Sequence, residues 1–163
     1  MALHLLIDGY NLLHQIPELV LLMQEDPEEA RKALLKQLQE YQRIRRHKIT
    51  VVFDAWGRNE PQSKVNIKGI QVIFTAHGET ADDYIKRRAA KEKERAVVIT
   101  SDRAIRSYVE TYGAISVTSR DFLSRMEAAF YEEMKGEKLA FEPRPRKRLP
   151  KKARQRLAKI AKL

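Results

Sequence analysis

Five short apolar runs limit the fold of this chain more than any other feature of its sequence. They cover residues 3–7, 49–53, 70–74, 96–100 and 114–117. Each run is mostly apolar and does not alternate regularly with polar residues, which is typical of strands buried on both faces. Stretches with a helical spacing of apolar residues lie between most of them. The order predicts a doubly wound, Rossmann-like α/β fold, with an open parallel sheet and helices on both faces.

Polar residues indicate where three of the helices begin. Asp26 stands before a proline, which is a favoured helix start. Thr80 with Asp83, and Thr118 with Asp121, have the spacing of a capping box. A helix is also expected from about residue 102 to residue 113. Its predicted apolar stripe is Ile105, Tyr108, Val109 and Tyr112. Residues 56–69 are polar and are interpreted as a connection before the third strand.

The composition excludes several classes of protein. The chain has 163 residues, of which 43% are hydrophobic, so it can form a core. It has no cysteine, which excludes disulfides, Cys-ligated zinc, iron–sulfur clusters and thiol catalysis. No apolar stretch is long enough to cross a bilayer, and no targeting segment is visible. A soluble, cytoplasmic protein without a membrane partner is therefore expected.

The net charge of +10 is concentrated in one segment. Residues 143–163 contain ten of the 32 basic residues and no acid, so the rest of the chain has 22 basic against 22 acidic residues. Residues 135–150 carry three prolines and are interpreted as a linker, and residues 150–162 are compatible with a short basic helix. Such a segment usually binds nucleic acid, although a tail that only improves solubility remains the alternative. The predicted nucleic-acid-binding residues here are Arg144, Arg146, Lys147, Arg148, Lys151, Lys152, Arg154 and Arg156.

Acidic residues follow four of the predicted strands. Asp8 ends the first run, Asp54 follows the second, Glu79 and Asp82 follow the third, and Asp102 follows the fourth. Ligands of open parallel sheets bind at the edge where the strands end. The sequence therefore predicts a cluster of carboxylates at that edge.

A cluster of this kind requires compensation. Two unit charges about 4 Å apart repel by roughly 4 kcal/mol at an effective dielectric constant of 20. Carboxylate ligands without His or Cys suit a hard cation such as Mg²⁺ or Mn²⁺. Such a cation can activate water and stabilise the leaving oxygen of a phosphodiester. Together with the basic segment, the cluster indicates a metal-dependent nuclease.

Several of these residues also have a purely structural interpretation. Asp83 is the third residue of a capping box, and of the two neighbours Asp82 is favoured for the site because it lies nearer the packed face of the helix. Asp102 is equally suited to cap its helix, and Glu79 to be an exposed loop acid. Asn11 could cap the helix after the first strand, or hold Asp8 or a phosphate.

Other catalytic classes lack their motifs. The chain contains neither the GxxxxGK[ST] nor the GxGxxG phosphate-binding loop, and no GxSxG nucleophile elbow. His77 is interpreted as a loop residue.

Four segments carry a resemblance to a known family. They read "LLIDGYNLLH", "VVFDAWG", "IQVIFTAHGETADDYIKRRA" and "VVITSDRAIR". In this order and spacing the sequence resembles the YacP-like branch of the NYN-domain ribonucleases, relatives of the PIN nucleases, over roughly residues 1–134. The remaining residues 135–163 form the basic linker and tail.

The resemblance implies a fold, an activity and a set of site residues. It implies a PIN-like sheet whose five predicted strands have the central order 3-2-1-4-5, and an endoribonuclease that depends on Mg²⁺ or Mn²⁺. It implies RNA as substrate and the ribosome as a plausible partner, with cleavage of translated mRNA. By position, the site residues of the family match Asp8, Asn11, Asp54, Glu79, Asp82 and Asp102.

Two alternatives stay open at this point. One is a catalytically silent module that binds RNA or the ribosome, although such a module would not need the acids. The other is a PIN-like nuclease that acts on DNA. Arg103, which follows Asp102, is added to the predicted nucleic-acid-binding residues.

Overall fold

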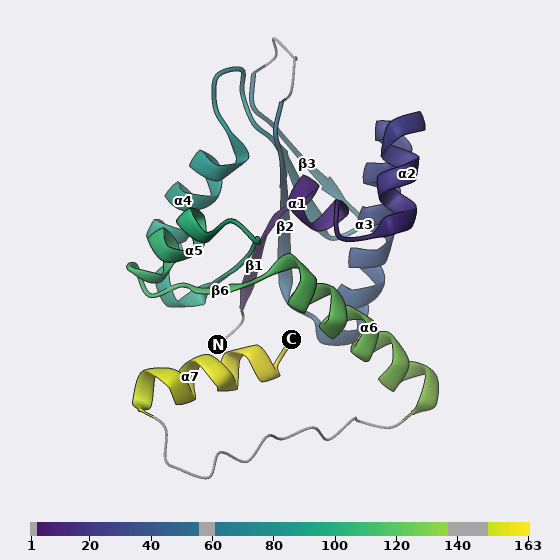
Figure 1. Cartoon of the computed structure of the whole chain (residues 1–163). Coiled ribbons are helices and arrows are strands. Elements are labelled where there is room, and N and C mark those ends of the chain that lie inside the picture. The colour runs from purple at the N-terminus through teal and green to yellow at the C-terminus, as the bar shows by residue number, and fades with distance from the viewer. Residues whose placement is uncertain (1–2, 56–60, 137–149) are drawn as a thin grey trace.

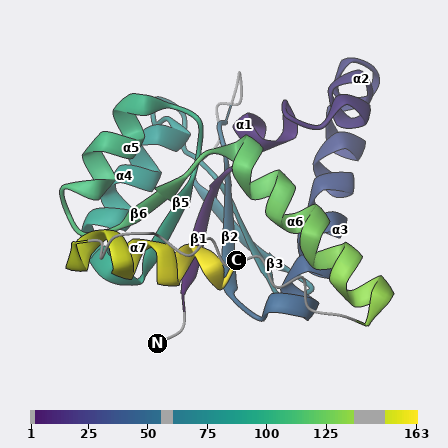
Figure 2. The same ribbon diagram turned by 60° about the horizontal axis from the view of Figure 1, so that its bottom comes forward.

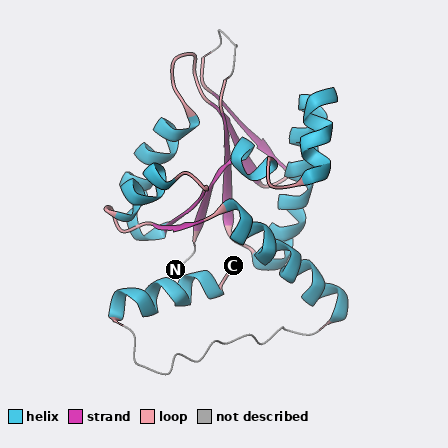
Figure 3. Ribbon diagram, in the orientation of Figure 1, coloured by secondary structure: helices cyan, strands magenta, loops and turns pink. Residues whose placement is uncertain are grey.

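The computed structural model describes residues 3–55, 61–136 and 150–163 (Figure 1). The strands are β1 His4–Asp8, β2 Lys48–Phe53, β3 Ser63–Ile67, β4 Ile70–Phe74, β5 Ala96–Ile99 and β6 Ile115–Val117. The helices are α1 Gly9–Leu13, α2 Pro17–Glu25, α3 Pro27–Arg45, α4 Ala81–Glu92, α5 Arg103–Glu110, α6 Ser119–Lys135 and α7 Lys151–Ala161, with a short 3-10 helix at Lys93–Arg95 (Figure 3). Within these residues, no helix is both long and apolar enough to cross a membrane.

The strands form one mostly parallel sheet of six strands in the order β3-β4-β2-β1-β5-β6. The five predicted strands are all present, and β4-β2-β1-β5-β6 is the central order that the resemblance implies. The sixth strand, β3, is antiparallel to β4 and lies at the edge of the sheet.

The interpretation of residues 56–69 as a mere connection is wrong, because part of this stretch forms β3. Lys68 and Gly69 have φ values of 49° and 92° and join Ile67 to Ile70 in a two-residue turn. Positive φ at both turn residues matches the twist of a β-hairpin. All five residues of β3 are exposed, so the strand lacks the continuous apolar run by which the other strands were found.

Helices lie on both faces of the sheet (Figure 2), and each face has its own apolar layer. The layer that contains α1, α3 and α6 packs on Leu5, Ile7 and Val51. The layer that contains α4 and α5 packs on Leu6 and Val98. Successive residues of β1 therefore enter opposite layers, as expected for a strand that is buried on both faces.

The predicted helix starts are observed, and the predicted stripe of α5 is half wrong. Asp26 and Thr118 each accept a hydrogen bond from the backbone N–H three residues on, and Thr80 forms a reciprocal capping box. Ile105 and Val109 of α5 are buried, whereas Tyr108 is 39% exposed and Tyr112, in the turn after α5, is 41% exposed. The reason is that α5 is the outer helix of its layer, where it packs mainly against α4 and β6, so its buried face is narrow.

The basic C-terminal helix α7 packs across the edge where the strands begin (Figure 1). Lys159 donates to the carbonyl of Glu94, just before β5, at 2.8 Å, and a ring nitrogen of His47, just before β2, lies 2.9 Å from the carbonyl of Lys162. Ile160 and Leu163 are buried, and the hydroxyl of Tyr41 donates to the carbonyl of Leu163 at 2.9 Å. This part of the basic tail is therefore integrated into the fold, at the edge opposite the predicted acidic site.

Candidate active site at the carboxyl edge of the sheet

The parallel strands end at the edge from which α1, α4 and α5 begin (Figure 1), and the four predicted aspartates lie at these strand ends and helix starts. Asp8 is the last residue of β1, and Asp54 directly follows β2. Asp82 is in the first turn of α4, and Asp102 is the N-cap of α5. The βα topology thus brings together residues that are up to 94 positions apart in the sequence.

Asp8 is the most perturbed of these acids. Burial, followed by the charges of Asp82 and Asp54, raises the pKa of its carboxyl to about 6. Two hydrogen bonds oppose the shift, one from the hydroxyl of Thr100 to Oδ2 at 3.2 Å and one from the backbone N–H of Asn11. The carboxyl is therefore held in a fixed position where ionisation is unfavourable.

Thr100 is a residue of this site that sequence reasoning missed. It is fully buried, and while its hydroxyl donates to Asp8 it accepts a hydrogen bond from the backbone N–H of Asp102 at 3.3 Å. One side chain thus ties the end of β1 to the start of α5. The only signal in the sequence is a polar residue at the end of an apolar run.

Asp82 faces the other acids, and Asp83 does not. The pKa of Asp82 is raised by burial first, then by the charges of Asp102 and Asp54, while the charge of Lys86 lowers it. Asp83 instead accepts a hydrogen bond from the backbone N–H of Thr80 at 3.3 Å and is exposed. The two neighbouring acids therefore have separate surroundings, as the position of the packed face predicted.

Asp54 and Asp102 each hold a helix terminus. Oδ1 of Asp54 accepts a hydrogen bond from the backbone N–H of Ala81 at 2.9 Å, which fixes the start of α4 against β2. Oδ1 of Asp102 accepts from the N–H groups of Ala104 and Ile105 at 2.8 and 3.3 Å. All three hydrogen bonds go to Oδ1, so each of these side chains can hold the start of a helix and also bind a metal ion.

Asn11 and Glu79 stand at the margins of the cluster. Oδ1 of Asn11 accepts from the backbone N–H of Ser101 at 2.9 Å and from the hydroxyl of Ser119 at 2.6 Å. The side chain of Asn11 therefore joins α1 to the loop after β5 and to α6, and does not cap α1, whose N-cap is Asp8. Glu79 pairs with Arg87 at 2.8 Å and shares with Asp54 a hollow of about 380 Å³.

The donor atoms of the cluster suit a hard divalent cation. They are carboxylate oxygens, which Mg²⁺ and Mn²⁺ prefer, and burial together with the charges of neighbouring acids raises the pKa values of Asp8 and Asp82, so a bound cation would offset an unfavourable ionisation. In the described part of the chain, no three His, Asp or Glu side chains are gathered closely enough to enclose a metal. The charges of these acids therefore act on one another, but within the described residues the side chains are not arranged closely enough to surround an ion.

The predicted nucleic-acid-binding residues are distributed over the molecule. Arg103 is exposed beside Asp102, at the acidic edge. Lys151, Lys152 and Arg154 are exposed on α7, at the opposite edge. Arg156 is engaged within the fold, where it donates to Glu110 at 3.2 Å and to the carbonyl of Ser116 at 3.1 Å. Arg144, Arg146, Lys147 and Arg148 lie outside the described residues.

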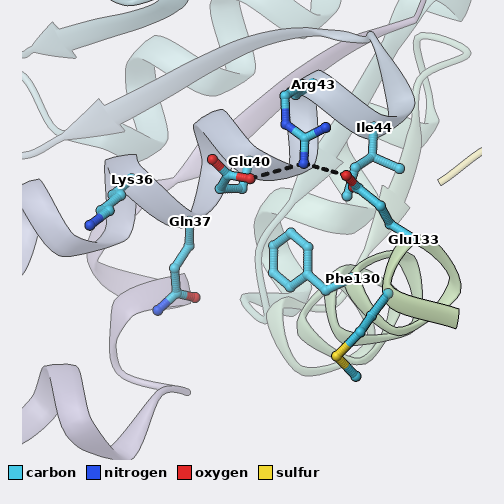
Figure 4. A pocket seen from close by; sticks show the side chains of 8 residues that line it. Lys36, Gln37, Glu40, Arg43, Ile44, Phe130 and Glu133 are labelled. Carbon is cyan, nitrogen blue, oxygen red and sulfur yellow. Dashed lines mark hydrogen bonds and ion pairs between the residues drawn. The ribbon is translucent and has the colours of Figure 1, made fainter.

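Another hollow lies between α3 and α6 and has a volume of about 440 Å³ (Figure 4). Ile44, Phe130 and Met134 supply most of its apolar lining, and Arg43 pairs with Glu133 beside them. It involves the C-terminal half of α3, which leads into the start of β2. It is therefore away from the carboxyl edge and contributes nothing to the acidic site.

The chain matches a model of the NYN domains, a class that implies a nuclease and whose nucleases typically use divalent metals, and the fold and the acidic edge agree with this class. Within that class the chain belongs to the YacP-like NYN domain family, whose model matches residues 5–162. The resemblance found in the sequence is thereby confirmed, and the match extends beyond residue 134 to include α7.

Known relatives agree with this assignment. The chain is 34% identical over 126 residues to the uncharacterized protein YacP of Bacillus subtilis, across 76% of this chain and 74% of YacP. The crystal structure of Rae1 (YacP) from Bacillus subtilis aligns with a TM-score of 0.65 at 30% identity, covering 83% of this chain and 79% of Rae1. A mutant form of Rae1 gives a TM-score of 0.68, with 83% and 80% covered.

Proposed function

We propose that this protein is a divalent-metal-dependent endoribonuclease that hydrolyses RNA phosphodiester bonds at the carboxyl edge of its sheet. The observation that carries the proposal is the position of Asp8, whose pKa of about 6 reflects burial next to the charges of Asp82 and Asp54. A purely structural aspartate gains nothing from such surroundings, whereas a ligand for a cation does.

Asp8, Asp54, Asp82 and Asp102 are the residues that would hold Mg²⁺ or Mn²⁺, with Glu79 at the rim. When bound, the ion supplies Lewis-acid stabilisation of the phosphodiester and lowers the pKa of a coordinated water. The protein supplies orientation: Thr100 fixes Asp8, and the bond from Ala81 to Asp54 fixes the turn of α4 that carries Asp82. Asn11, held by Ser101 and Ser119, keeps the first turn of α1 against the cluster.

The family assignment favours RNA as the substrate, and the resemblance adds translated mRNA and the ribosome as the proposed cellular context, in the cytoplasm. A silent RNA-binding module is disfavoured, because carboxylates repel a polyanion and weaken its binding. A DNA-directed nuclease would use the same acids, so the choice between RNA and DNA depends on the substrate assay.

The test is cleavage of an RNA and a DNA oligonucleotide of the same sequence, with Mg²⁺, with Mn²⁺ and with EDTA. We expect internal cleavage of the RNA that requires metal and is lost by orders of magnitude in Asp8→Asn. Asp83→Asn is the matched control, because it removes one charge next to Asp82 while the amide oxygen of asparagine can still accept the hydrogen bond from the Thr80 N–H, so cleavage should be retained. Metal-independent cleavage, or an active Asp8→Asn, would contradict the proposal, and preferred DNA cleavage would reassign the substrate.

A further inference from the structure

Tyr108 on α5 and Tyr112 in the turn that follows α5 are both exposed, although the helical pattern of the sequence places them on a buried stripe. Tyr108 is 39% exposed and Tyr112 is 41% exposed. Their ring centroids are 5.2 Å apart with the planes inclined by 46°, and their hydroxyl oxygens are 3.5 Å apart. The pair therefore forms one continuous aromatic surface that faces solvent.

A cation completes this surface. The ammonium of Lys86, on the neighbouring helix α4, lies 5.3 Å from the centroid of the Tyr108 ring. A cation over an aromatic face at this distance is held by the ring quadrupole. Lys86, Tyr108 and Tyr112 thus form a row in which a positive charge is followed by two aromatic rings, here called the tyrosine platform.

The tyrosine platform is continuous with the acidic edge. Lys86 is one helical turn beyond Asp82 on α4, and it is close enough to lower the pKa of Asp82 by its charge. Asp102 starts α5, and Tyr108 follows it by six residues, which is about 9 Å along a helix axis. Both helices begin at the acidic edge, and Lys86 and Tyr108 lie further along them. The platform is therefore next to the acidic edge, on the surface of these helices.

The chemistry of the platform fits an unpaired nucleic-acid strand. Single-stranded RNA presents base faces that stack on aromatic side chains, and phosphates that pair with a cation. A duplex hides its base faces and cannot use such a surface in the same way. The tyrosine hydroxyls and the lysine also make the surface too polar for a simple apolar contact. Glu110 lies on α5 as well, but it is engaged by Ser116 and Arg156.

We propose that Tyr108 and Tyr112 stack two unpaired bases of the RNA, and that Lys86 pairs with the phosphate between them and the acidic edge. The inference rests on the proposed function, since it assigns the path of the substrate strand on one side of the cleavage site. It gives the protein a physical reason to prefer unpaired RNA.

The test measures binding apart from cleavage, in an Asp8→Asn background with Mg²⁺ present, so that the RNA stays intact. Fluorescence anisotropy would follow a labelled single-stranded oligoribonucleotide and a duplex of the same length. Tyr108→Ala and Tyr112→Ala should each weaken single-strand binding on the order of ten-fold, with little effect on the duplex. Tyr108→Phe should bind as the parent does, because stacking needs the ring and not the hydroxyl.

Tyr131→Ala provides the matched control. Tyr131 is 46% exposed on α6 and also has a lysine over its ring, Lys135 at 5.7 Å, but it lies on the opposite layer. Unchanged binding in both platform variants, or an equal loss in Tyr131→Ala, would overturn the inference, as would an equal loss for the duplex. A failure of the proposed function would be seen in a different experiment. The protein without the Asp8→Asn substitution would then cleave no RNA, whatever binding the platform variants show.

Discussion

Asp8 occupies a position where burial opposes its ionisation. This gives the free energy of unfolding a pH dependence of predictable sign. The pKa of its carboxyl is about 6 in the folded protein, against 3.8 for an unperturbed aspartate. A raised carboxyl pKa means that the folded state binds the proton more tightly than the unfolded state does. The free energy of unfolding therefore falls as the pH rises from about 4 to above 6, and ionised Asp8 destabilises the metal-free fold at neutral pH.

We expect Asp8→Asn to stabilise the metal-free protein at pH 7 while it abolishes cleavage. The substitution removes the charge and keeps the size, so the destabilisation should be relieved, by up to about 3 kcal/mol for a shift of two pKa units. Urea unfolding at pH 4 and pH 7 in EDTA measures this, and the difference between variant and parent should be larger at pH 7. Asp83→Asn should instead lose about 1 kcal/mol or less, because it only weakens a cap. A less stable Asp8→Asn at pH 7 would show that the carboxylate is structural.

A divalent cation should stabilise the parent protein by mass action. Binding to the folded state alone adds roughly 2.7 kcal/mol when the metal is at 100 times its dissociation constant. Thermal melts in EDTA and in millimolar Mn²⁺ would measure the shift in Tm, which should be much reduced in Asp8→Asn. Equal midpoints for the parent with and without Mn²⁺ would count against metal binding at the four aspartates.

Individual residues of the site differ in how well the sequence predicted them. The choice of Asp82 over Asp83 followed from helical geometry, because a capping residue and its neighbour point about 100° apart. The partners of Asn11 are Ser101 and Ser119, which are 90 and 108 residues away, so no local pattern could identify them. Thr100 was missed for the same reason: its role depends on which strand lies beside its own.

At the scale of elements, the sequence predicts those helix starts and strands that depend only on neighbouring residues. The caps of α3 and α4 and the five buried strands follow from neighbouring residues alone. Strand β3 was missed because it is exposed on an edge and depends on its pairing with β4. The exposure of Tyr108 was missed because it depends on α5 being the last helix of its layer.

The N-cap of α4 offers a prediction about an element that carries the site. Thr80→Ala removes the acceptor for the N–H of Asp83 at 3.1 Å, and should cost about 1 kcal/mol of stability. It should also lower cleavage, because the first turn of α4 positions Asp82. Asp26→Ala is the control, since it removes the N-cap of α3 at a similar cost and away from the acids. Stability from urea unfolding and cleavage rates, measured side by side, separate the two effects. Equal cleavage in both variants would mean that the cap does not position Asp82.

At the scale of the molecule, the charge distribution is divided between two opposite edges of the sheet. The acids gather where the strands end, and the basic helix α7 covers the edge where they begin. The sequence predicted the excess of charge but not its place, because where a helix docks depends on distant partners such as Tyr41 and Glu94. The strands between the two edges are about five residues long, or roughly 16 Å.

This separation predicts that the exposed cations of α7 contribute to binding only when the RNA is long. The variant with Lys151, Lys152 and Arg154 all changed to Ala should reduce the slope of log affinity against log salt by up to about 2, at roughly 0.7 for each phosphate contact. A short oligonucleotide confined to the acidic edge should show the parental slope, because it cannot reach α7. Cleavage at saturating RNA and low salt should be unchanged, since none of the three cations is near the aspartates.

Ile160→Ala is the complementary variant, because it alters the packing of α7 and leaves its charge intact. Ile160 is buried against the core, so its truncation should cost about 2 kcal/mol or more of stability, with the salt slope for long RNA retained wherever the protein stays folded. Salt titrations with a short and a long RNA, together with urea unfolding, measure both variants. A triple variant that loses affinity equally for short and long RNA would mean that the strand reaches α7 directly from the site. An unaltered slope for long RNA would assign the exposed cations of α7 to another anionic partner.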